Sequence, residues 1–112
     1  MSLELNDLST FFACEPTVDA GDNAWKHAGA AFRYVQAEDD VFCNLAPGKG
    51  ELYVVWRQDG IKRVELSLEG YFEVRLEHQH GVQCLLAQPS QTDRAPLILQ
   101  LKPYVLVALR AN

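Results

Sequence analysis

The sequence predicts a mainly β protein of about eight antiparallel strands with one short helix near the N-terminus. Apolar and polar residues alternate through much of residues 51–88, and glycine-containing turn pairs separate the alternating runs. A chain of 112 residues, 48% of them apolar, is long enough to bury a core, and we expect a single domain over 1–112. Eight strands of this length form either a two-sheet sandwich or a small barrel, and the sequence does not decide between them.

The N-terminal third contains the helix candidates. Apolar residues at helical spacing predict one helix over residues 4–13, with Asn6 or Asp7 as its cap: Leu5, Leu8, Phe11 and Phe12. Residues 14–24 are polar and turn-rich, which predicts a loop. Residues 24–36 fit either a helix or a strand. We prefer a strand over 30–36 that forms a hairpin with residues 41–45, joined by a turn at 38–40, and we expect a loop over 47–50.

Residues 51–88 predict a hairpin meander of four strands, 51–58, 61–68, 72–79 and 82–88. A two-residue turn at Asp59-Gly60 would pair the first two strands. Its register gives the pairs Val55–Val64, Tyr53–Leu66, Trp56–Arg63 and Val54–Glu65. A three-residue loop at 69–71 would then give the pairs Leu66–Val74, Glu65–Arg75 and Arg63–Glu77.

The C-terminal third continues the sheet. A turn at His80-Gly81 would place Leu76 opposite Leu85 and Gln83 opposite His78. After a loop over 88–96, residues 97–102 and 104–109 predict two further strands, separated at Pro103. These two are more continuously apolar, so we expect them to be buried on both faces.

Composition excludes several classes of function. The formal net charge of -5, without an evident Lys/Arg cluster, argues against nucleic acid and against anionic membranes as partners. The sequence has no apolar run long enough to span a membrane and no signal-peptide pattern near its start, so we expect a soluble cytoplasmic protein. Three well-separated cysteines at 14, 43 and 84 fit neither a zinc motif nor a disulfide framework, and we expect no cofactor.

The preferred function is a non-enzymatic module that binds a protein partner or associates with itself, with a homodimer as one form. The expected register places Trp56 on one sheet face with Arg63, Arg75 and Glu77. An aromatic residue beside paired charges is typical of binding hot spots, so these four are the candidate binding residues. The alternative is a structural role, in which another element of the same chain covers Trp56.

The alternative function is a small β-barrel that holds a metal or a small molecule, with an enzyme as one version of it. An H-x-H pair on a strand points both imidazoles to one face, which makes His78 and His80 the candidate metal ligands, with Glu77 near them at the barrel mouth. No third ligand follows at a suitable spacing. No coherent catalytic set is present, so we assign no catalytic residues and lean against an enzyme.

Overall fold

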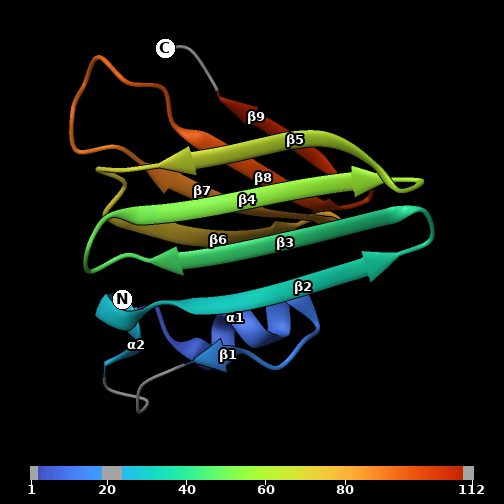
Figure 1. The fold of residues 1–112 in the computed structure, drawn as a ribbon, viewed down its shortest axis with the longest axis horizontal. Helices are drawn as coiled ribbons and strands as arrows, with labels where there is room; N and C mark the ends of the chain where they lie inside the picture. The colour runs from blue at the N-terminus through green and yellow to red at the C-terminus, as the bar shows by residue number, and fades with distance from the viewer. Residues whose placement is uncertain (1–2, 19–23, 110–112) are drawn as a thin grey trace.

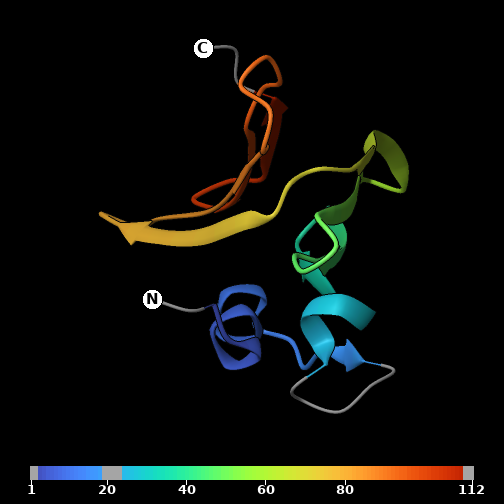
Figure 2. The ribbon, with the colours of Figure 1, turned by 90° about the vertical axis from the view of Figure 1, so that its left-hand side faces the viewer.

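The computed structural model describes residues 3–18 and 24–109 and forms an antiparallel β sandwich (Figures 1 and 2). The five-stranded sheet contains, in spatial order, β1 (Thr17–Val18), β2 (Ala30–Gln36), β3 (Asp39–Ala46), β4 (Glu51–Gln58) and β5 (Ile61–Leu68). The four-stranded sheet contains β6 (Glu73–Gln79), β7 (Val82–Gln88), β8 (Leu97–Lys102) and β9 (Leu106–Leu109). The predicted fold class is confirmed, and the barrel alternative is wrong.

The predicted N-terminal helix is α1 (Leu5–Phe12). Its cap residue is Glu4 and not Asn6 or Asp7; the Glu4 N–H donates to the Asp7 carboxylate at 3.0 Å. The helix ends at Ala13, which adopts a left-handed conformation with φ 52°. Figure 2 shows α1 in line with the four-stranded sheet, where it packs on β2. The helix therefore fills the side of the sandwich that the shorter sheet leaves uncovered.

The ambiguous segment 24–36 contains both structures that its pattern allows. One helical turn, α2 (Trp25–Ala28), is followed by Gly29 at φ 101° and then by β2. The turn before β3 consists of Ala37 and Glu38, so the expected turn at 38–40 was placed too late. The expected loop over 14–24 contains the short strand β1, and its residues 19–23 lie outside the described part of the chain.

The β4–β5 hairpin has the predicted turn but a different register. Its last pair is Gln58 with Ile61, as a two-residue turn requires. A β-bulge at Trp56/Arg57 then shifts the pairing by one residue, so that Trp56 lies opposite Val64. Without the bulge, the apolar side of β4 would share a face with the charged side of β5. Four expected pairs are therefore wrong: Trp56–Arg63, Val55–Val64, Tyr53–Leu66 and Val54–Glu65.

The expected meander is interrupted between β5 and β6, which belong to different sheets. The chain leaves β5 at Leu68, crosses from one layer to the other and enters β6 at Glu73. Apolar residues of both strands still pack against the core: Leu66, Leu68, Val74 and Leu76. The predicted inward faces are correct, but the predicted pairs Leu66–Val74, Glu65–Arg75 and Arg63–Glu77 are wrong.

The predicted turn at His80-Gly81 is confirmed, with φ values of 55° and 79°. Leu76 lies opposite Leu85, and Gln83 opposite His78. In β8 only the inner residues are fully buried, whereas Ile98 on the outer side stays partly exposed. The expectation that β8 and β9 are buried on both faces was therefore wrong.

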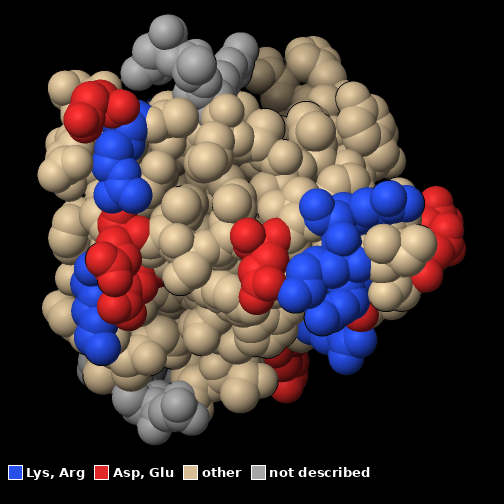
Figure 3. Space-filling view, turned by 45° about the horizontal axis from the view of Figure 1, so that its top comes forward, with Lys and Arg blue, Asp and Glu red and all other residues tan. Residues whose placement is uncertain are grey.

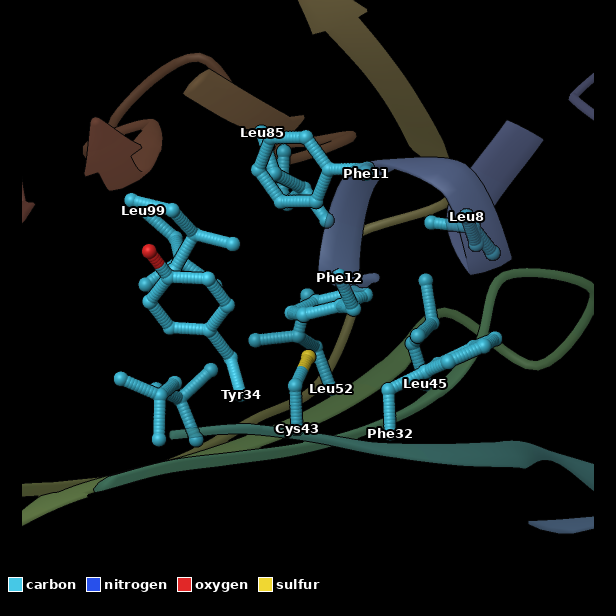
Figure 4. Packing of buried hydrophobic residues seen from close by; sticks show 14 of the residues in the cluster. Leu8, Phe11, Phe12, Phe32, Tyr34, Cys43, Leu45, Leu52, Leu85 and Leu99 are labelled. Atoms are coloured by element: carbon cyan, nitrogen blue, oxygen red, sulfur yellow. The ribbon is translucent and has the colours of Figure 1, made fainter. Parts of the chain in front are cut away.

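One apolar cluster fills the space between the two sheets and α1 (Figure 4). Phe12 stacks on Phe32 of β2, with ring centroids 5.0 Å apart and an interplanar angle of 10°. Phe11 meets Phe12 edge to face at 4.9 Å and lies near Leu85 of the other sheet. The aromatic side chains of α1 thus join the helix to both layers.

Candidate protein-binding surface

The outer face of the five-stranded sheet, which we call the aromatic face, is turned toward the viewer in Figure 1, and no described element lies over it. Cross-strand register arranges its side chains in rows. One row is Arg33, Phe42, Val55 and Glu65. The next row is Ala31, Asn44, Tyr53 and Ser67. Apolar and aromatic groups therefore occupy the middle strands, and charged groups lie beside them.

Two aromatic side chains form the centre of this face. The rings of Phe42 and Tyr53 meet edge to face at 6.2 Å. The Tyr53 hydroxyl donates to a Glu65 carboxylate oxygen at 2.6 Å, and Lys62 Nζ donates to the other oxygen at 2.7 Å. Lys62 and then Tyr53 hold the pKa of Glu65 below its ordinary value. The carboxylate stays charged at neutral pH and fixes the orientation of the Tyr53 ring.

Basic side chains gather at the end of this face where the β4–β5 hairpin turns (Figure 3). Arg33 donates two hydrogen bonds to the Asp40 carboxylate, at 2.9 and 2.6 Å, and this pair lowers the pKa of Asp40. Arg57 lies opposite Asp40 on one side and Lys62 on the other. These cations come from three strands that are separated in the sequence. No run of Lys and Arg residues therefore indicated that they lie together.

Trp56 does not belong to this surface. Its side chain is half-buried and packs against the core, and its Nε1 donates to Asp39 Oδ1 at 2.9 Å. Arg63 is exposed beside the bulge, whereas Arg75 and Glu77 lie on the other sheet. The face expected to unite Trp56, Arg63, Arg75 and Glu77 therefore does not exist, because it followed from the wrong register. The binding roles of the four residues stay predictions.

The two histidines lie apart from any metal-like cluster. His78 lines an open groove of about 430 Å³ between β6 and α1, together with Asp7, Thr10 and Phe11. His80 is an exposed residue of the following turn. Among residues 3–18 and 24–109, no three His, Cys, Asp or Glu side chains come together as a metal site would require. Within the same ranges, neither helix has the length and apolar character needed to cross a bilayer.

The fold and this surface define the molecule as a small β sandwich with an exposed, ordered aromatic face. No family model and no curated protein matches the chain. Among solved structures, it resembles a chain of a contact-dependent growth inhibition toxin–immunity protein complex from Klebsiella pneumoniae 342, with a TM-score of 0.78. The match covers 95% of this chain and 91% of that chain at 12% sequence identity, which establishes a shared fold.

Proposed function

We propose that this chain is an immunity-type binding module, which inhibits a growth-inhibiting toxin by binding it. The fold similarity carries the proposal, because it extends over 95% of this chain and 91% of a chain from a toxin–immunity protein complex. Both partners of such a complex act on each other through protein–protein contact. An immunity module agrees with the protein-binding function that the sequence favoured. The sequence did not indicate which partner is bound.

The distribution of reactive groups supports the immunity role over the toxin role. Charged side chains on the aromatic face pair with one another at the surface, as in Arg33–Asp40 and Lys62–Glu65. Cys43 is fully buried, and burial raises its pKa to about 12, so its thiol is neutral and inaccessible. These ion pairs order the side chains of the surface. Catalytic groups converge on one pocket, whereas these groups do not.

The aromatic face is the surface that we assign to the partner. Interface centres are rich in aromatic residues and arginine, and a rigid aromatic side chain loses little entropy on binding. Phe42 is 36% exposed, and the Glu65 hydrogen bond holds Tyr53 in place before any partner arrives. Arg57 lies on the same face and would form an ion pair with an acidic group on the toxin.

A growth assay tests the proposal directly. A candidate contact-dependent growth inhibition toxin is expressed from an inducible promoter, with or without the chain. Co-expression is expected to restore growth, and titration calorimetry with an inactivated toxin is expected to show binding. If the chain neither restores growth nor binds, the proposed function is wrong.

The surface assignment is tested by paired substitutions in the same assay. Phe42→Ala combined with Arg57→Glu removes an aromatic anchor and reverses a charge on the aromatic face. Tyr104→Ala is the control, since Tyr104 is 64% exposed outside that face. We expect the double variant to lose protection while it stays folded, and the control to protect fully. Equal protection by both would exclude the aromatic face.

A further inference from the structure

The outer face of the four-stranded sheet is unusually apolar for a surface that no described element covers. Its central rows join β7, β8 and β9, and we call them the apolar face: Leu86, Ile98 and Ala108 in one row, Cys84, Gln100 and Leu106 in the other. All six side chains are at least partly exposed, and Leu106 is 40% exposed. An antiparallel sheet normally presents polar residues on its solvent side. A surface of this composition indicates an interface.

The polar groups within the apolar face are already paired. Gln100 Nε2 donates to the Tyr104 carbonyl oxygen at 2.8 Å. The Cys84 thiol lies 3.9 Å from Gln100 Oε1, to which it donates. A contact that excluded water from this face would therefore leave these groups with hydrogen-bond partners, so the penalty for buried unpaired polar atoms is small.

Charges occur only at the margin of this face among the described residues of the sheet, and they are balanced. Glu73, Arg75 and Glu77 lie on β6 and Lys102 lies at the end of β8, which gives two positive and two negative groups. The whole chain has a net charge of -5, so this is a face where two copies can approach with little repulsion. Arg75 and Glu77 are neighbours, with nitrogen and oxygen 3.7 Å apart.

We propose that the apolar face binds a second copy of this chain and forms a symmetric homodimer. A two-fold interface must be complementary to itself. A two-fold axis that lies in the face and crosses β6 between Arg75 and Glu77 places each Arg75 over the partner's Glu77. The apolar rows of the two copies then pack against each other, as the facing sheets of a sandwich do.

The size of the face sets the strength of the dimer. The strands have 7, 7, 6 and 4 residues; at about 3.3 Å per residue and about 4.8 Å between strands, the face presents about 400 Å² per copy. The two copies together bury about 800 Å², below the range of about 1,200–2,000 Å² for stable complexes. The dimer is therefore weak and reversible, with dissociation in the micromolar range or above. The aromatic face lies on the opposite sheet and remains free for the proposed partner.

Sedimentation velocity of the purified chain from about 1 μM to a few hundred μM tests the inference. We expect a shift from monomer to dimer as concentration rises. Ile98→Lys, in the middle of the apolar face, should weaken the dimer by about tenfold or more. Val35→Lys is the matched control, because Val35 is 59% exposed on the other sheet, and it should dimerise normally. A wild-type chain that stays monomeric throughout would overturn the proposal.

A charge exchange provides a second test that does not disturb the core. Arg75→Glu alone and Glu77→Arg alone should each weaken the dimer, because like charges then face each other across the axis. The double variant should restore dimer formation. Dimers that are unaffected by all three variants and by Ile98→Lys would place the contact elsewhere. None of these measurements involves a toxin, so their outcome is independent of the growth assay.

Discussion

Replacement of Phe12 by alanine is the sharpest test of how α1 closes the sandwich. Phe12 is 1% exposed, stacks on Phe32 and contacts Phe11. Truncation of a buried phenylalanine costs about 3–5 kcal/mol, because the transfer energy is lost and a cavity remains. A domain of this size has a total stability of only about 5–15 kcal/mol. We therefore expect Phe12→Ala to lower the melting temperature by about 12–20 °C.

Urea unfolding followed by circular dichroism measures the loss of free energy of unfolding, and a thermal melt measures the shift in melting temperature. Phe42→Ala is the control, since it removes the same side chain from the exposed aromatic face, and we expect it to cost about 1 kcal/mol or less. A loss for Phe12→Ala that is equal to that of the control would refute the reasoning. It would mean that α1 does not contribute its aromatic residues to the shared core.

Three further predictions concern single positions. Gly48→Ala should cost about 1–3 kcal/mol in urea unfolding, because a Cβ there would lie 2.9 Å from the Lys26 carbonyl oxygen; unchanged stability would contradict this contact. Cys43 should resist thiol reagents in the native protein at pH 8 and react only after unfolding. Burial raises the pKa of the Cys43 thiol from 9.0 to about 12. The contribution of the neutral thiol to stability is therefore complete below pH 9 and declines as the pH rises toward 12. Cys43→Ala should reduce this decline when the free energy of unfolding is measured against pH. Trp56→Phe should cost about 1 kcal/mol in thermal unfolding through loss of the hydrogen bond to Asp39, and a variant as stable as wild type would show that this bond contributes nothing.

The candidate surface was largely hidden from sequence reasoning. Phe42 and Tyr53 lie on different strands, and only the pairing of β3 with β4 brings their rings together. The cations around Arg57 are likewise separated along the chain. Conversely, Trp56 is a large aromatic residue that suggested a binding site, yet it alternates with Leu52 and Val54 on the core side of β4. Side-chain type could be read from the sequence, but membership of a face depends on register.

The sequence by itself determined the N-terminal helix, most of the longer strands and the direction of most side chains. The turns at Asp59-Gly60 and His80-Gly81, the helix over residues 5–12 and the inward alternation of Leu66, Leu68, Val74 and Leu76 all follow from local chemistry. Tertiary structure alone decided that β5 and β6 do not pair but lie in different sheets. An alternating strand buries the same face in two arrangements: its neighbour can lie beside it in one sheet or opposite it across the core. The patterns of β5 and β6 are therefore satisfied either way. In the folded chain β5 and β6 take the second arrangement, and residues of both sheets and of α1 share one apolar core.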